Sequence, residues 1–204
     1  MTHPAYSSVM NLLQSYDQDS NEQSHHLWMA SELLKLITGG SVTAGQRTHL
    51  RYQMAICLDL GGKPFDALEV FNEIIKEEPH NLEYQHSMLV IQGRVERLAQ
   101  EAYLQDEKSP VLINYHEILN ANLYSPFWLC CAVARIFAQS GRKADAKALM
   151  LHLHELTPKD PDSLRECLRV ARMSGDQAWE HDVLDQIEQV REKRPHDPRY
   201  GELI

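Results

Sequence analysis

A 34-residue periodicity is the sequence feature that most restricts how this chain can fold. Residues 48–81 align without a gap with residues 127–160. In each segment an alanine precedes a glycine by seven residues, a second alanine follows that glycine by five, and a proline follows it by seventeen. These residues are Ala55, Gly62, Ala67 and Pro79 in the first segment, and Ala134, Gly141, Ala146 and Pro158 in the second. A fixed period of this length is typical of stacked helical repeats.

Each of these positions has a physical role in a pair of antiparallel helices. A small alanine allows two helices to cross closely, and the glycine ends the first helix because the chain turns there with a positive φ. The proline ends the second helix. Between these positions apolar residues recur at helical spacing, for example at Met54 and Leu58. The pattern therefore predicts a helix–turn–helix in each segment.

A third copy of the pattern covers residues 161–194. Leu168 and Gly175 keep the seven-residue spacing, and Gly175 follows Gly141 by one full period of 34 residues. Glu180 stands where the other copies have their second alanine. We therefore expect this copy to be degenerate or to act as a C-terminal cap.

This pattern resembles the tetratricopeptide repeat (TPR) family. That family's unit is a helix–turn–helix of about 34 residues with small residues, a large apolar residue and a proline at set positions. The matching residues are Ala55, Ala67, Phe71 and Pro79, and then Ala134, Ala146, Met150 and Pro158. Position 4 of the unit departs from the family, since it is Arg51 in one segment and Cys130 in the other. The resemblance implies an all-α fold, namely an α-α superhelix (solenoid) of stacked antiparallel helix pairs.

The segment between the two good repeats continues the helical pattern. Residues 82–126 predict a degenerate, longer helical pair with one helix over 82–104 and another over 111–119. In Ser125-Pro126, serine is typical of a helix N-cap and proline of the first helical position.

The two ends of the chain are less regular. Residues 1–47 predict divergent N-terminal helices over 6–16 and 27–37. Residues 195–204, which contain two prolines, are expected to form a tail. No strand pattern occurs, so the chain is expected to be all-α. We also expect all segments to form one structural domain.

Composition excludes several functional classes. The formal net charge of −9 over 204 residues argues against a protein that binds nucleic acid through a basic face. No apolar run approaches the ~18 residues of a membrane span, and the first residues lack the pattern of a signal peptide. The four cysteines, all within apolar helical stretches, are expected to be buried thiols in a reducing compartment. These features predict a cytoplasmic protein that neither binds nucleic acid nor inserts into a membrane.

The sequence contains no recognisable catalytic motif. The glycine-rich phosphate loop, the dinucleotide fingerprint and the serine nucleophile elbow do not occur. The eleven histidines are not spaced as metal ligands. We therefore expect a protein that is not an enzyme, with no catalytic residues, no cofactor and no metal.

The resemblance implies a concave groove lined by the first helix of each pair. Its residue positions identify candidate partner-binding residues, which are Tyr52, Ile56, Asp59, Trp128, Arg135, Gln139, Arg165, Arg169 and Arg172. Tyr52 and Ile56 stand where the family's clamp for a C-terminal carboxylate has lysine and asparagine. The first repeat therefore favours an apolar peptide or an amphipathic helix.

Three of these arginines, Arg165, Arg169 and Arg172, form one helical stripe, and Arg135 takes the position of Arg169 one repeat earlier. Two interpretations remain open. The stripe could bind an acidic partner segment, because guanidinium groups pair bidentately with carboxylates. Alternatively it is a solvated helix face with local ion pairs, such as Asp162 with Arg165.

Three functions are compatible with these observations. The leading hypothesis is a non-catalytic adaptor or scaffold that binds a partner protein or peptide in its concave groove. The arginine stripe leaves open whether that partner has an acidic segment. One alternative is a cytoplasmic chaperone for a secreted or assembling client. Another is a small-molecule sensor or an enzyme with an unrecognised pocket. The sequence leaves the partner, the pathway and the oligomeric state open. The partner of a repeat protein is determined by variable surface residues and not by the fold.

Overall fold

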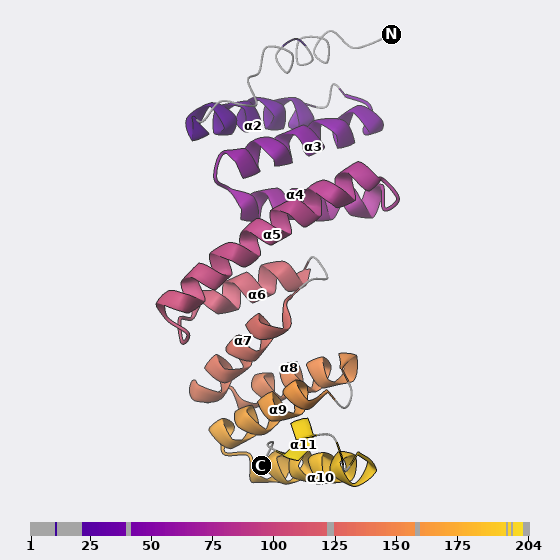
Figure 1. The fold of residues 1–204 in the computed structure, drawn as a ribbon. Helices are drawn as coiled ribbons and strands as arrows, with labels where there is room; N and C mark the ends of the chain where they lie inside the picture. The colour runs from indigo at the N-terminus through magenta and orange to yellow at the C-terminus, as the bar shows by residue number, and fades with distance from the viewer. Residues whose placement is uncertain are drawn as a thin grey trace. The chain divides into compact units, whose positions relative to one another are not determined.

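The chain was analysed as a computed structural model, which describes Asn11 and residues 22–39, 42–121, 125–157, 160–194, 196 and 198–201. These residues are mainly helical, and no strand occurs among them (Figure 1). They belong to two compact units, Met1–Arg97 and Leu98–Ile204, and the boundary lies within helix α5 (Leu82–Gln105). The expected helix over 6–16 lies outside the described residues except for Asn11.

The first unit contains the start of α5 together with α2 (Gln23–Thr38), α3 (Ala44–Leu60) and α4 (Pro64–Glu77). Helix α2 packs against α3, and α3 packs against α4. Thr43 fixes the start of α3 through a capping box, in which its side chain and that of Gln46 each accept a hydrogen bond from the other's backbone N–H. The core between α2 and α3 includes the buried side chains of Met29, Leu33 and Leu50.

The second unit contains the end of α5 together with α6 (Val111–Ala121), α7 (Phe127–Gln139), α8 (Lys143–Leu156), α9 (Pro161–Ser174), α10 (Gln177–Lys193) and α11 (Pro198–Gly201). From α6 to α10 each helix packs against the next, and α7 also packs against α9 (Figure 1). Successive pairs are thus stacked through their first helices, as in a TPR-like solenoid. The all-α fold of stacked antiparallel helix pairs is confirmed.

The repeat residues lie where the periodicity predicts them. The alanines of both good repeats, Ala55, Ala67, Ala134 and Ala146, are fully buried. So are Phe71 and Met150, the large apolar residues of the second helices. These side chains fill the crossing of the two helices in each pair, which explains why two positions must be small and one large. Pro158 lies outside the described residues.

The same turn closes the first helix of all three repeats. Gly62, Gly141 and Gly175 have φ values of 76°, 80° and 65°. In each case the backbone N–H of the following residue donates to a carbonyl five residues earlier; these bonds join Lys63 to Leu58, Arg142 to Phe137, and Asp176 to Ala171. This is the hydrogen bond of a Schellman motif, which requires a left-handed residue at the turn. The glycine of the sequence pattern is therefore needed for its positive φ.

One local expectation, the N-cap at Ser125, is wrong. Ser125 does not cap α7, because Pro126 occupies the N-cap position and no side chain caps the helix. The Ser125 hydroxyl lies instead 2.8 Å from Nδ1 of His116 on α6 and 3.4 Å from Sγ of Cys130. The expected tail over 195–204 contains a short helix, α11, which packs against α10. A proline can begin a helix as well as end one.

The glycine turns generate a stability prediction. Gly141→Ala should lower the free energy of unfolding by about 1–2 kcal/mol, because an L-residue is strained at this φ although nothing lies within 4 Å of the added Cβ. Gly93→Ala is the matched control, since its added Cβ also meets nothing but lies inside α5. That variant should be more stable by about 1 kcal/mol. Urea denaturation of both variants checks the contrast, and equal effects would contradict the conformational explanation.

The buried histidine of α6 generates a prediction on pH. Burial lowers the pKa of His116 below its ordinary 6.5, and the nearby Glu117 only partly offsets this. The unfolded chain then takes up a proton at a higher pH than the folded chain does. The contribution of neutral His116 to the free energy of unfolding is therefore fully present above pH 6.5. It is lost as the pH falls through the lowered pKa of the folded state.

In His116→Asn the free energy of unfolding should fall less than in the wild type between about pH 7.5 and about pH 5.5. Urea denaturation at both pH values measures the difference. The same loss in both proteins would show that protonation of His116 is not linked to folding.

Candidate partner-binding site

The second unit contains a cavity of about 560 Å³ between the end of α5, α7 and α9. Its lining residues are Gln100, Tyr103, Leu104, Phe127, Trp128, Cys131, Arg135 and Glu166. Two of the candidate groove residues, Trp128 and Arg135, line this cavity. Cavities that hold drug-sized ligands or anchoring side chains have volumes of about 300–1,000 Å³.

Aromatic and aliphatic side chains form one wall of the cavity. The ring of Tyr103 meets that of Trp128 edge to face, with centroids 5.7 Å apart and planes at 61°. Phe127 and Trp128 begin α7, and Tyr103 lies in the last turn of α5. The Leu104 side chain is 82% exposed at the rim. Such a surface binds large apolar groups, because it loses little side-chain entropy on binding.

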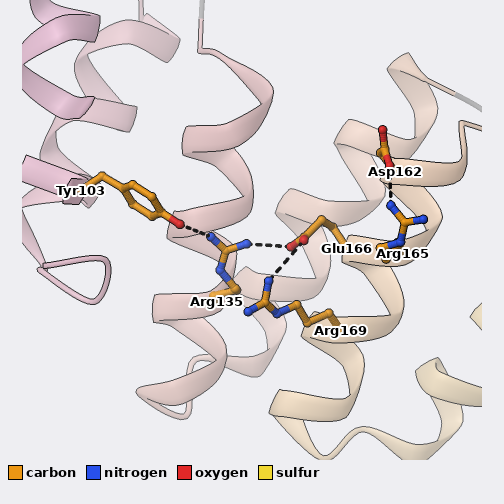
Figure 2. Close-up of polar contacts among 6 residues, drawn as sticks. All are labelled: Tyr103, Arg135, Asp162, Arg165, Glu166 and Arg169. Carbon is orange, nitrogen blue, oxygen red and sulfur yellow. Dashed lines mark hydrogen bonds and ion pairs between the residues drawn. The ribbon is translucent and has the colours of Figure 1, made fainter. Parts of the chain in front are cut away.

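Charged groups form the other end of the cavity. Nη1 of Arg135 donates to Oε2 of Glu166 over 2.7 Å, and Nη2 donates to the Tyr103 hydroxyl over 3.3 Å (Figure 2). The Arg135 and Glu166 side chains are only 14% and 18% exposed. Arg169 approaches the other oxygen of the same carboxylate, with its Nη1 3.5 Å from Oε1 (Figure 2). The Glu166 carboxylate thus contacts two arginines from neighbouring repeats.

The other two arginines of the stripe have carboxylate partners of their own. Arg165 contacts Asp162 at 2.6 Å on the exposed face of α9, and Arg172 contacts Glu180 of α10 at 2.8 Å. The local pair expected between Asp162 and Arg165 is therefore present. Like Arg169, these two arginines are not among the lining residues of the cavity.

The candidate residues of the first repeat contact the first part of α5 within their own unit. The Tyr52 hydroxyl donates to Glu83 over 3.1 Å and lies 3.3 Å from the hydroxyl of Ser87. Asp59 pairs with Arg94 at 2.8 Å while its side chain is only 6% exposed. Burial raises the pKa of Asp59, and Arg94 opposes that rise. These polar groups are thus engaged in helix–helix contacts.

The remaining two candidates have different surroundings. Ile56 is half-buried on α3, and Gln139 is exposed in the last turn of α7. Neither lines the cavity of the second unit. The candidate set therefore divides between the two units.

The thiol that lines the cavity is not an activated nucleophile. Burial, with a contribution from Glu166, raises the pKa of the Cys131 thiol to about 12, so the thiolate is not populated at neutral pH. Within the described ranges, no cluster of three histidine, cysteine or carboxylate side chains could hold a metal ion. No helix in the described part of the chain is long and apolar enough to cross a bilayer.

Sequence reasoning missed four residues of the cavity that matter to its shape and charge, which are Tyr103, Leu104, Phe127 and Glu166. Tyr103 and Leu104 lie in the degenerate pair, where the period assigns no groove positions. Glu166 is three residues before Arg169, so helical spacing alone could have indicated that pair. Its contact with Arg135 depends on the packing of α7 against α9.

Comparisons with known proteins find similarity only among solved structures, since no family model and no curated protein matches the chain. One match is a crystal structure of the nearly identical TPR-like repeats of a Podosopora anserina kinesin light chain-like protein, at 18% sequence identity and a TM-score of 0.38. A point variant of that protein matches at 17% identity and a TM-score of 0.37. Each alignment covers 97% of this chain and 100% of the other.

The contrast between buried and surface arginines generates a prediction. Arg135→Gln should lower the free energy of unfolding by about 2 kcal/mol, because it leaves Glu166 in a largely buried position with one distant partner. Arg165→Gln is the matched control, and its exposed pair should contribute less than about 0.5 kcal/mol. Denaturant unfolding measures both values. A loss of similar size in the two variants would show that Arg135 is a surface arginine like the others.

Proposed function

We propose that this protein is a non-catalytic, TPR-like adaptor or scaffold that binds a segment of a partner protein in the cavity of its second unit. The observation that carries the proposal is the combination of an aromatic wall with a buried charged pair in one cavity of about 560 Å³. Tryptophan, tyrosine and arginine are the residues that contribute most often to protein-binding hot spots. Here Tyr103, Trp128 and Arg135 supply all three in a single cavity.

The proposed contact is an apolar anchor from the partner against Tyr103 and Trp128. These two rings already touch edge to face, so the wall is formed before the partner arrives. A preformed aromatic surface binds with a smaller entropy cost than a surface that must become ordered. The partner's anchor is therefore a large apolar side chain, carried by an extended peptide or by one face of a helix.

The proposal favours an adaptor in the cytoplasm over the alternatives. The four cysteines are buried and none is part of a disulfide in the described residues, as is usual in a reducing compartment. An enzyme using this cavity would need a reactive group, but its thiol has a raised pKa and its carboxylate is paired with arginine. A chaperone would use the same wall, and it differs from an adaptor in requiring a client that is unstable without it.

Trp128→Ala tests the proposal with peptides selected from a random display library against the wild-type protein. Removing a hot-spot tryptophan should weaken binding by about 30-fold, equivalent to about 2 kcal/mol. Trp28→Ala is the matched control, because that tryptophan is 48% exposed on α2 in the first unit. Fluorescence anisotropy gives the Kd values. Peptides that bind Trp128→Ala as tightly as the wild type would place the binding surface elsewhere.

A further inference from the structure

The second unit contains another pocket, of about 340 Å³, which shares no lining residue with the aromatic cavity. It lies between the last turn of α8, the start of α9 and the last turns of α10. Its volume is at the lower end of the range of small-molecule sites. The pocket therefore has the size of a site for a compact ligand.

Helix α10 presents one face to this pocket. Gln186, Gln189, Val190 and Lys193 follow one another at intervals of three, one and three residues, which places them on the same side of the helix. Val190 is half-buried, and Leu164 on α9 is only 1% exposed. The lining thus combines apolar surface with two amides that can donate hydrogen bonds.

Two cations at the end of α10 also line the pocket, and the described residues do not neutralise them. Neither Lys193 nor Arg194 forms an ion pair with a described residue, and no carboxylate is among the described lining residues. Arg191, at the same helix end, contacts Glu188 at 3.3 Å and lies outside the lining. Cations stabilise a helix C-terminus in general, so that effect applies to Arg191 as well. The pocket differs in carrying unbalanced positive charge.

His154 of α8 supplies an independent observation. Its Nδ1 atom is buried and has no hydrogen-bond partner in the part of the chain that the structure describes. Buried polar atoms of native proteins nearly always have a partner, and an imidazole N–H donates to oxygen. A ligand oxygen in the pocket can fill this role.

We infer that this pocket binds a small organic anion, in which a carboxylate or phosphate group is attached to a compact apolar body. The anionic group pairs with Lys193 and Arg194, whose guanidinium group matches both carboxylate and phosphate oxygens. The apolar body packs against Leu164 and Val190. A cationic ligand would be repelled, and a neutral one would leave both charges unpaired. The inference is independent of the proposed function.

The test uses three probes with the same ring system, which are 2-naphthoate, 2-naphthyl phosphate and the neutral 2-naphthamide. Naphthyl fluorescence anisotropy gives the Kd values. At low salt the wild-type protein should bind at least one of the anions about tenfold more tightly than the amide. The anion that binds more tightly shows whether the site prefers a carboxylate or a phosphate.

The double variant Lys193→Gln with Arg194→Gln should abolish this preference. Both side chains are exposed, so their replacement should leave the fold intact. Arg191→Gln is the matched control, because it removes a cation from the same helix end but outside the lining. Trp128→Ala is a second control for binding in the aromatic cavity, and both controls should keep the preference.

A direct readout comes from protein labelled with ¹⁵N at its histidines. The Nδ1 signal of His154, assigned by its loss in His154→Gln, should shift when the preferred anion saturates the protein, because the nitrogen gains a partner.

Four outcomes would overturn the inference. These are equal affinities of the anions and the amide, a preference that survives in the double variant, a preference that is lost in Arg191→Gln, and an unchanged His154 signal at saturation. Loss of binding in Trp128→Ala would also overturn it, by placing the probes in the aromatic cavity.

Discussion

A left-handed glycine ends the first helix of each repeat, and the register of the second unit depends on that turn. At Gly141 and Gly175 the positive φ allows a backbone hydrogen bond across five residues, which fixes where the next helix begins. Equivalent residues then recur after 34 positions with the same orientation. This is how α9 packs beside α7 with Arg169 in the place that Arg135 takes one repeat earlier. The charged end of the cavity thus follows from a backbone conformation that only glycine adopts easily.

The charged residues of the cavity lining balance each other, whereas the whole chain is acidic. The protein carries a net charge of −9, yet the lining of its cavity pairs Arg135 with Glu166, and Arg169 lies 3.5 Å from the same carboxylate. The overall charge weakens long-range attraction of an acidic partner, and salt screens that effect beyond about 10 Å. Contacts within the cavity act over shorter distances and are screened less. Recognition there depends on the arrangement of a few charges, which composition does not reveal.

Much of the fold could be predicted from the sequence, because the helix signals are local and repeated. The first helix of the degenerate pair was expected over 82–104 and is found at Leu82–Gln105. The N-cap expected at Ser125 was wrong. The Ser125 hydroxyl forms a hydrogen bond with His116, nine residues earlier on another helix, and does not cap α7. The arginine stripe could be predicted from helical spacing. The identity of its partners could not, since Glu166 reaches Arg135 only through the packing of two helices.

Two residues of the cavity could be predicted from the periodicity of the sequence. Trp128 and Arg135 lie at regular positions of a good repeat, so the period identifies them. Tyr103 comes from a pair without a regular period, and only tertiary structure brings its hydroxyl to within 3.3 Å of Arg135. Residues supplied by an irregular segment are therefore the part of such a site that sequence reasoning misses.

The packing order of the second unit has a consequence for local unfolding. Its helices from α6 to α10 contact mainly their sequence neighbours. For such an array we expect opening to start at an end and to move inward helix by helix. Helices α7 and α9, which carry Arg135 and Glu166, have neighbours on both sides. Their amide protons should exchange with solvent more slowly than those of α10 and α11. The charged end of the cavity can therefore stay formed while the last helices fray.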